Sequence, residues 1–377
     1  MSRLERLHEC GQSYWLDHLT GAMIREGELQ RRISHEGLRG VTVNPSMFAV
    51  AFASGPYDSD IRGLAQGGKG SGEMYESLLV ADVQEACDLF IGLHDTSARV
   101  DGYVSLDLSP HLAHDAVGTM REARRFRALV DRPNLLIKVP GTTAGFLAIE
   151  QLIYEGISVN VTLLCSLPTY EAVMEAYVAG LERRSAERRP LMEVSCVASF
   201  FLGRIDCLVD QLLEQRDRPS DGRALSAGLR GKAAVALAKL AYRSFRRTFS
   251  GERWDRLAVK GANLQRPLWA STSTKDVPNR DLMYVEALIG RDTVTTMSEQ
   301  TIQAFKDHGE VKPNEIERGV EEAARTIQSL SEAGIDLHCV AWQLEHEGIK
   351  QLTEAFDRAD RELEEKRRRA VTKPAAA

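Results

Sequence analysis

Short apolar runs alternate with longer amphipathic stretches along most of the chain. Eight of the runs have the length and β-branched content of buried strands. They cover residues 13–17, 40–46, 102–108, 134–140, 156–163, 192–199, 268–271 and 293–297. Most are followed by apolar residues at helical spacing. The expected helices cover residues 22–33, 74–92, 110–129, 144–155, 168–183 and 225–249. Another helix follows residues 200–204 and ends near residue 215, and further helices are expected toward the end of the chain.

This alternation indicates a parallel sheet, because each strand is followed by a helix long enough to cross over to the next one. Eight such units in roughly 300 residues predict a single (β/α)8 TIM barrel with additional terminal helices. A doubly wound open sheet is the alternative. We expect the barrel to span residues 1–365, and residues 366–377 to form a charged, disordered tail.

Polar residues stand at or near the carboxyl ends of six of the expected strands. They are Asp17, Asn44, Asp107, Lys138, Asn160 and Ser199. In a barrel these strand ends converge on one mouth, and the mouth is where barrels of this kind carry out chemistry. The pattern therefore favours the barrel over the open sheet.

Lys138 lies near the end of an apolar run that breaks at once into Pro-Gly-Thr-Thr. An unpaired ammonium is costly to bury, so a lysine in this place has access to a neutral, nucleophilic amine. Such an amine forms Schiff bases with carbonyl substrates. The run alone leaves two other interpretations open: the side chain extends to the surface, or it pairs with a buried carboxylate.

Composition narrows the class of protein. The 377 residues are 43% hydrophobic and 27% charged, with a net charge of −6, which is typical of a globular protein and argues against a general nucleic-acid binder. Six scattered cysteines without a CxxC pair favour reduced thiols over disulfides or a metal site. The N-terminus lacks the apolar core of a signal peptide, and no run is long enough to span a membrane. We therefore expect a cytoplasmic protein without a metal or a cofactor.

Five blocks in the same order resemble the motifs of the transaldolase family, and of its bacterial branch in particular. They are residues 40–46, 136–140, 156–163, 198–204 and 265–271. The resemblance implies a class I aldolase-type barrel of the pentose-phosphate pathway that needs no metal. Such an enzyme moves a dihydroxyacetone unit from sedoheptulose 7-phosphate or fructose 6-phosphate to glyceraldehyde 3-phosphate or erythrose 4-phosphate. The partners would be sugar phosphates, and the sequence leaves monomer and homodimer open.

The resemblance also implies roles for single residues. Lys138 would be the nucleophile, and Asp17 would be the general acid and base. Asp107 would be the carboxylate that activates a water molecule, and Thr162 would hold that water by a hydrogen bond. The substrate-binding residues would be Thr42, Asn44, Asn160, Ser199 and Phe201, with Arg204, Ser271 and Lys275 around the phosphate. Simpler roles stay open: Asp17 as a helix N-cap, and the two asparagines as strand terminators.

Two positions bear on the kind of reaction. Phe201 stands where a tyrosine marks simple aldolases that act on free dihydroxyacetone, so phenylalanine favours transfer. Asp107 stands where the family has a glutamate, so the carboxylate is shorter by one methylene. A displacement of about 1 Å can cost about a hundredfold in rate. The alternatives are therefore a related enzyme or aldolase for a different sugar phosphate, or a catalytically impaired sugar-phosphate-binding barrel.

Overall fold

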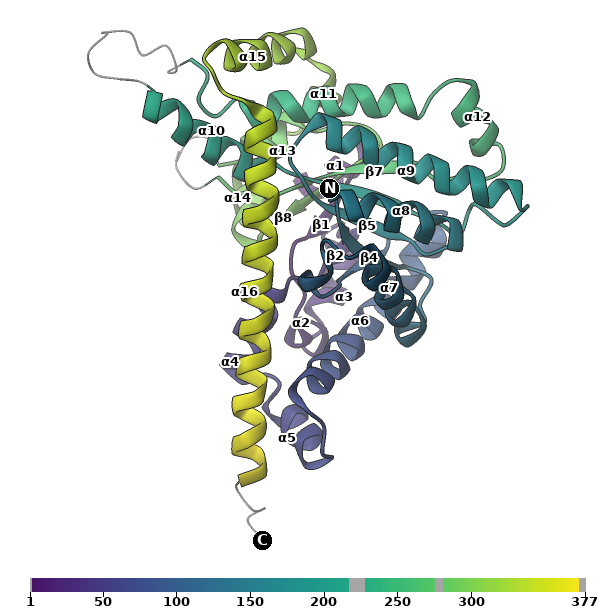
Figure 1. The fold of residues 1–377 in the computed structure, drawn as a ribbon, viewed down its shortest axis with the longest axis vertical. Coiled ribbons are helices and arrows are strands. Elements are labelled where there is room, and N and C mark those ends of the chain that lie inside the picture. Colours follow the sequence, from purple (N-terminus) through teal and green to yellow (C-terminus); the bar gives the residue numbers. More distant parts are fainter. Residues whose placement is uncertain (1, 217–227, 275–280, 373–377) are drawn as a thin grey trace.

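Eight parallel strands close into a barrel in a computed structural model that describes residues 2–216, 228–274 and 281–372 (Figure 1). Each strand pairs with its neighbours in the sequence, and β1 pairs with β8. The strands are β1 (Gln12–Leu16), β2 (Gly40–Thr42), β3 (Tyr103–Asp107), β4 (Leu135–Pro140), β5 (Val159–Leu164), β6 (Cys196–Phe201), β7 (Gln265–Ala270) and β8 (Thr293–Met297). The predicted (β/α)8 barrel is confirmed, and the open sheet is excluded.

Helices surround the barrel. They are α1 (Arg3–Glu9), α2 (Gly21–Arg25), α3 (Glu28–His35), α4 (Pro45–Ser54), α5 (Asp58–Gln66), α6 (Ser71–Thr96), α7 (Ala116–Val130), α8 (Thr143–Glu155), α9 (Leu167–Ala186), α10 (Leu202–Arg216), α11 (Ala233–Thr248), α12 (Glu252–Ala258), α13 (Met283–Ala287), α14 (Glu299–His308), α15 (Val320–Glu332) and α16 (Leu337–Thr372), with short 3₁₀ turns η1 (Pro110–Leu112) and η4 (Glu315–Glu317). Residues 225–227 of one expected helix lie outside the described residues. The expected helix over 22–33 is divided in two, because Gly27 adopts a left-handed conformation with φ of 74°.

Strand β6 differs from the prediction at both ends. It begins at Cys196 and continues through Phe201, whereas the sequence placed its end at Ser199. Phe200 is buried in the main core and Phe201 packs against the apolar cluster inside the barrel, so both rings have partners on the sheet. This packing extends the strand past the point where the apolar pattern alone suggested a turn.

The inside of the barrel is filled by side chains from alternate strand positions. One apolar cluster contains Trp15, Tyr103, Leu136, Val197, Leu268, Ala270 and Val294. Gly40 on β2 makes room for it, since a Cβ there would lie 2.5 Å from the Trp15 ring. The larger core lies between the strands and the outer helices. Side chains therefore fill the middle of the barrel, while a cavity of about 230 Å³ lies at its amino-terminal end against Tyr103, Leu136 and Val197.

The opposite, amino-terminal end of the barrel holds a buried polar cluster. Arg266 on β7 donates to Asp101 Oδ1 at 3.0 Å through Nη1 and to Ser13 Oγ at 2.6 Å through Nη2. The same two nitrogens also donate to the carbonyls of Val100 and Thr293 at 3.0 and 2.7 Å. Ser13 in turn donates to Asp101. The cluster ties the start of β1 to the segment before β3 and to β7 and β8.

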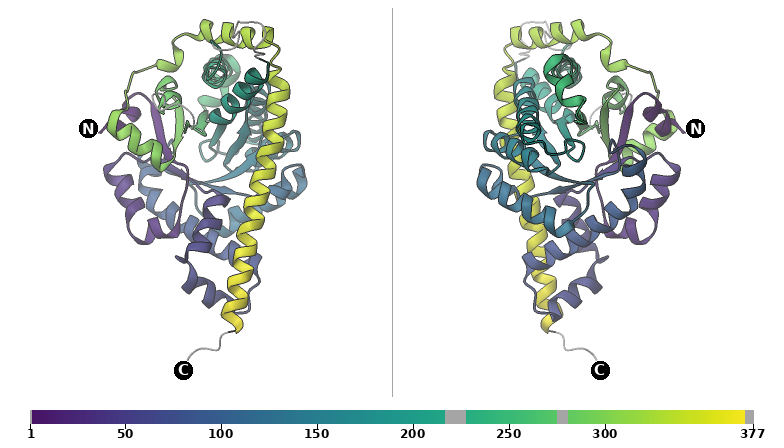
Figure 2. Two further views of the ribbon diagram at one scale, coloured as in Figure 1. Left: turned by 90° about the vertical axis from the view of Figure 1, so that its left-hand side faces the viewer. Right: turned by 90° about the vertical axis from the view of Figure 1, so that its right-hand side faces the viewer.

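The long helix α16 runs along one side of the molecule from α10 past the mouth of the barrel to α4 and α5 (Figures 1 and 2). It includes residues 366–372, so the expected disordered tail is wrong for that segment, while residues 373–377 lie outside the described part. Lys366 forms an ion pair with Asp58 on α5, and Glu364 pairs with Arg367 and Arg368 one turn later. Charged pairs at this spacing support a helix that the charge-rich sequence did not suggest.

Among the described residues, no helix is both long enough and apolar enough to cross a membrane.

Candidate active site

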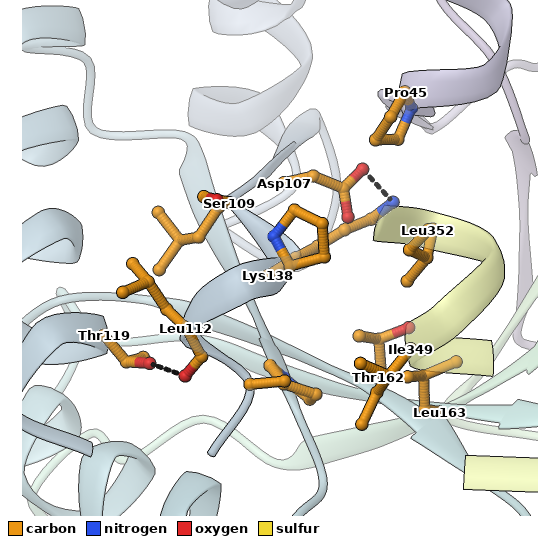
Figure 3. A pocket seen from close by; sticks show the side chains of 14 residues that line it. Pro45, Asp107, Ser109, Leu112, Thr119, Lys138, Thr162, Leu163, Ile349 and Leu352 are labelled. Atoms are coloured by element: carbon orange, nitrogen blue, oxygen red, sulfur yellow. Dashed lines mark hydrogen bonds and ion pairs between the residues drawn. The ribbon is translucent and has the colours of Figure 1, made fainter. Parts of the chain in front are cut away.

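Lys138 lies on β4 with its ammonium group at the mouth of the barrel. Its Nζ donates to the carbonyl of Val43 at 2.7 Å. It also donates to Asp107 Oδ2 at 3.0 Å (Figure 3). Both side chains are largely buried, with exposed fractions of 14% for Lys138 and 12% for Asp107. The lysine is thus not isolated: it pairs with a buried carboxylate, as one interpretation of the sequence allowed. An amine acts as a nucleophile only in its neutral form, so the reaction requires a group that accepts a proton from the Lys138 nitrogen.

Asp107 is the nearest acceptor for that proton. Burial raises the pKa of the Asp107 carboxyl above its ordinary value, and the neighbouring Lys138 opposes this rise. The register of the sheet places the two residues directly opposite each other on β3 and β4. Asp107 therefore contacts the lysine directly, at the distance of a hydrogen bond. A carboxyl with a raised pKa is a better proton acceptor than an ordinary aspartate.

A small cavity opens beside this pair. It has a volume of about 30 Å³, and its walls include Asp107, Lys138 and Thr162 from the strands and Ile349 and Leu352 from α16 (Figure 3). That volume holds about one water molecule. Three of the four predicted catalytic residues therefore line one partly open cavity. A sugar phosphate is much larger than this cavity, and Asp17, Asn44 and Arg204 lie outside its lining.

Asn160 on β5 is fully buried beside the lysine, since the register pairs it with Lys138 on β4. Its Nδ2 donates to Ser105 Oγ at 3.0 Å, and its Oδ1 accepts from Ser199 Oγ at 2.7 Å. Two predicted substrate-binding residues, Asn160 and Ser199, are thereby in direct contact. The asparagine does more than end a strand, because hydrogen bonds fix its side chain inside the barrel.

Asn44 and Thr42 lie at the end of β2. The Asn44 Oδ1 accepts from the backbone N–H of Ser46 at 3.0 Å and caps α4, a role that the sequence analysis had considered for Asp17 and not for this asparagine. Its Nδ2 makes no hydrogen bond with any other described residue and remains a donor for a ligand. Thr42 is buried and stands opposite Ser105 in the register of β2 and β3.

Asp17 follows the last residue of β1. Its side chain is 42% exposed, and its Oδ1 lies 3.1 Å from His18 Nδ1. The N-cap of the next helix, α2, is Thr20, whose hydroxyl accepts from the backbone of Met23. Asp17 is therefore not a helix cap. Among the four predicted catalytic residues it is the one most accessible to solvent, and it lies outside the small cavity of Lys138.

Arg204 begins α10 next to the mouth. Its guanidinium lies 5.6 Å from the centre of the Phe201 ring and forms no ion pair with a carboxylate of the described residues. Gly203 N donates to the carbonyl of Ser271 at 2.9 Å, and a Cβ on Gly203 would lie 2.8 Å from that oxygen. The glycine thus brings Arg204 and Ser271 close together. An arginine without a carboxylate partner is suited to bind phosphate. Lys275 lies outside the described residues.

Sequence reasoning missed several parts of this site. The Val43 carbonyl could not be found, because backbone contacts between separate strands leave no sequence signal. Ser105 could have been found: it precedes Asp107 by two positions on β3, so strand periodicity places both side chains on the same face. Ile349 and Leu352 had no signal, since α16 could equally have packed elsewhere.

Within the described ranges, no group of three or more His, Cys, Asp or Glu side chains is arranged to hold a metal ion. Residues 14–363 match the family model described as Transaldolase/Fructose-6-phosphate aldolase. A protein of Thiobacillus denitrificans named Transaldolase is 45% identical over 357 residues, which cover 94% of this chain and 98% of that protein. A Nostoc protein named Transaldolase 2 is 43% identical over 97% and 98% of the two chains. A Streptomyces coelicolor protein named Transaldolase 1 is 42% identical over 94% and 92%.

Proposed function

The chain belongs to the transaldolase/fructose-6-phosphate aldolase family, and we propose that it transfers a dihydroxyacetone unit between sugar phosphates through a Schiff base on Lys138. The observation that carries this proposal is the Lys138 amine, which is hydrogen-bonded to Asp107 beside a cavity at the mouth of the barrel. A nucleophilic lysine beside a proton acceptor is the arrangement that imine chemistry requires.

The reaction begins when the Lys138 proton passes to Asp107. The neutral amine then attacks the carbonyl carbon of the ketose phosphate, and the resulting carbinolamine loses water to give the protonated imine. Asp107 returns its proton to the departing hydroxyl. Thr162 lies in the same cavity and holds the water molecule that is released. The cavity has room for that single molecule.

Carbon–carbon bond cleavage follows. The Asp17 carboxylate takes the proton of the hydroxyl on the fourth carbon, the bond between the third and fourth carbons breaks, and its electron pair passes into the imine to give an enamine. An aldose phosphate leaves. The acceptor aldose then takes up the three-carbon unit, with Asp17 returning the proton to the new hydroxyl. Water finally releases the product ketose from Lys138.

The substrates are anionic, whereas the protein has a net charge of −6. The acidic protein can still bind an anionic substrate, because positive charge is needed only where the phosphate binds, and Arg204 supplies it there. Its guanidinium is held at the mouth by the Phe201 ring and the contact of Gly203 with Ser271. We propose fructose 6-phosphate or sedoheptulose 7-phosphate as donors, with erythrose 4-phosphate or glyceraldehyde 3-phosphate as acceptors.

Borohydride trapping tests the proposal directly. The protein is incubated with fructose 6-phosphate, reduced, digested and analysed by mass spectrometry, with Lys138→Ala as the control. A three-carbon adduct on Lys138 is expected in the wild type and no adduct in the variant. A folded wild-type protein that gives no adduct with fructose 6-phosphate or sedoheptulose 7-phosphate would refute the Schiff base.

An aldolase that releases free dihydroxyacetone is the second candidate, because the family description includes both activities. The Phe201 ring next to Arg204 favours transfer, as the resemblance implied. Measuring free dihydroxyacetone with and without erythrose 4-phosphate separates the two. A transferase gives a new ketose phosphate that depends on the acceptor, whereas an aldolase releases dihydroxyacetone in its absence.

A further inference from the structure

Ser105 occupies the middle of β3 and is completely buried. Its hydroxyl accepts a hydrogen bond from Asn160 Nδ2 at 3.0 Å, although β4 lies between their two strands. Asn160 Oδ1 accepts from Ser199 Oγ at 2.7 Å. Side chains from β3, β5 and β6 thus form one chain of hydrogen bonds across the inside of the barrel, next to Lys138.

These bonds decide what the asparagine can offer a ligand. An amide group has two N–H donors and one oxygen. Ser105 takes one of the N–H groups and Ser199 donates to the oxygen, so one N–H remains for a substrate hydroxyl. The Ser199 hydroxyl already donates its hydrogen bond to Asn160 Oδ1, so toward a ligand it can only accept a hydrogen bond. The hydrogen bonds among Ser105, Asn160 and Ser199 fix the orientation of the Asn160 amide. They also determine which groups donate and which accept hydrogen bonds toward the substrate.

Ser105 also supports the lysine from the other side. Its backbone carbonyl accepts the N–H of Val43 at 2.9 Å, and the Val43 carbonyl accepts from Lys138 Nζ at 2.7 Å. The side chain of Ser105 therefore acts on the substrate-binding amide, while its backbone acts on the nucleophile. A change limited to the hydroxyl separates these two contributions.

We propose that Ser105 is a positioning residue that aligns the Asn160 amide with a hydroxyl of the bound three-carbon unit. This inference rests on the proposed function, since it assigns Asn160 to the substrate. Without the Ser105 hydroxyl the amide can rotate, and a displacement of about 1 Å can cost about a hundredfold in rate. The loss belongs to turnover more than to substrate affinity, because the Arg204 site is unchanged.

The central experiment compares Ser105→Ala with Thr295→Val. Thr295 lies on β8, is completely buried, and its hydroxyl has no hydrogen-bond partner among the described residues. Both variants remove one buried hydroxyl from a barrel strand. We expect Ser105→Ala to lower kcat by roughly ten- to a hundredfold, with KM changed by less than about threefold. Thr295→Val should keep the wild-type kcat, and Ser105→Thr, which keeps a hydroxyl, should recover most of the loss.

A double-mutant cycle provides a readout that a purely structural role would not move. Ser105 and Ser199 both bond to Asn160, at opposite ends of its amide. If they act through that amide, the loss of kcat in Ser105→Ala/Ser199→Ala should fall at least about threefold short of the product of the single losses. Fully multiplicative losses would overturn the inference, as would a Ser105→Ala kcat equal to that of Thr295→Val.

Borohydride trapping in the same variants separates this inference from the proposed function. The wild type and Ser105→Ala should both carry the three-carbon adduct on Lys138, since the hydroxyl does not touch the nucleophile. A trapped adduct together with unchanged turnover in Ser105→Ala would refute the positioning role alone. A folded wild type without any adduct would refute the Schiff base and this inference with it.

Discussion

The two ends of the barrel each bury a cation and a carboxylate 3.0 Å apart, and they differ in how completely the cation is bound. At the amino-terminal end, Arg266 makes four hydrogen bonds through its two terminal nitrogens. At the mouth, Lys138 makes two, to Asp107 and the Val43 carbonyl, and a cavity lies beside it. The cation thus makes four hydrogen bonds at one end, where only Arg266 Nε lacks a partner among the described residues, and two at the other.

The chemistry of the two cations matches this difference. A guanidinium keeps its proton under all ordinary conditions, so Arg266 can hold strands together but cannot take part in proton transfer. An amine can lose its proton to a neighbouring carboxylate, and it then becomes a nucleophile. We infer that the pair of Arg266 and Asp101 contributes stability, and that the pair of Lys138 and Asp107 contributes reactivity.

The largest effect should come from removing the reactive cation. Lys138→Met keeps a long apolar side chain but cannot form an imine, so we expect transfer activity to fall by roughly four to six orders of magnitude. The variant should remain folded, because Asp107 can take up a proton when its partner is lost. Steady-state kinetics and circular dichroism test both points. Activity within tenfold of the wild type would show that Lys138 is not the nucleophile.

The matching change at the amino-terminal end of the barrel should lower stability and leave activity unchanged. Arg266→Met removes the cation that lies 3.0 Å from Asp101 and leaves Arg39 Nη1, at 3.8 Å, as its remaining ion-pair partner among the described residues. Breaking a buried pair costs about 3–5 kcal/mol of unfolding free energy, and we expect a loss near the lower end of that range. Denaturant unfolding measures this loss. At a temperature where the variant is folded, its kcat should equal that of the wild type. A lower kcat without a change in stability would mean that the amino-terminal pair affects the chemistry, and Asp101→Asn gives a milder version of the same test.

Removing the carboxylate at the mouth should have a smaller effect on rate. Asp107→Asn keeps an oxygen that can accept from Lys138 but loses the proton acceptor, so we expect kcat/KM to fall by about a hundredfold. Because Asp107 must be ionised to accept the proton, the wild-type rate should rise with pH through its raised pKa, above the range of an ordinary aspartate. This rise should vanish in the variant. An identical acid limb in both proteins would assign it to another group.

A third buried carboxylate sharpens the comparison because it has no cation within ion-pair distance among the described residues. Asp82 on α6 accepts a hydrogen bond from Tyr57, and burial raises its pKa to about 6 from an ordinary value of 3.8. Its neutral form is therefore favoured in the folded state. The stability from this effect is complete below pH 3.8 and is lost as the pH rises through about 6.

We expect Asp82→Asn to increase the unfolding free energy at pH 8 by about 3 kcal/mol relative to the wild type. At pH 4 the two proteins should differ little, since Asp82 is then largely protonated when folded. Denaturant unfolding at the two pH values is the measurement. Equal differences at pH 4 and pH 8 would mean that ionisation of Asp82 does not affect stability.

The sequence predicted the barrel well because alternation of apolar runs and amphipathic stretches is a local property. Each of the eight expected strands has a counterpart, and the expected residues Asp107, Lys138 and Thr162 line one cavity. Helices α1, α4, α5, α12 and α13 were missed. They are short, and α4 is apolar nearly all round, so helical periodicity had little to act on.

Contacts between distant segments could not be predicted from the sequence. Val43 and Lys138 are 95 positions apart, and the bond between them depends on strand register. The ion pair of Lys366 with Asp58 holds a segment that looked like a free tail. Helix α16 depends on such contacts along its length, and a single sequence does not show which surface it covers. The residues around Lys138 were therefore predicted more completely than the wall that encloses them.

That wall has a consequence for the order of events during synthesis. Ile349 and Leu352 follow all eight strands in the chain, so the ribosome makes them after the last strand of the barrel. The strands can begin to fold while α16 is still inside the ribosome, since chains fold from the amino-terminal side during translation. We therefore expect Lys138 and Asp107 to come together before α16 covers them, and the Lys138 amine to be exposed in the nascent barrel until α16 is released.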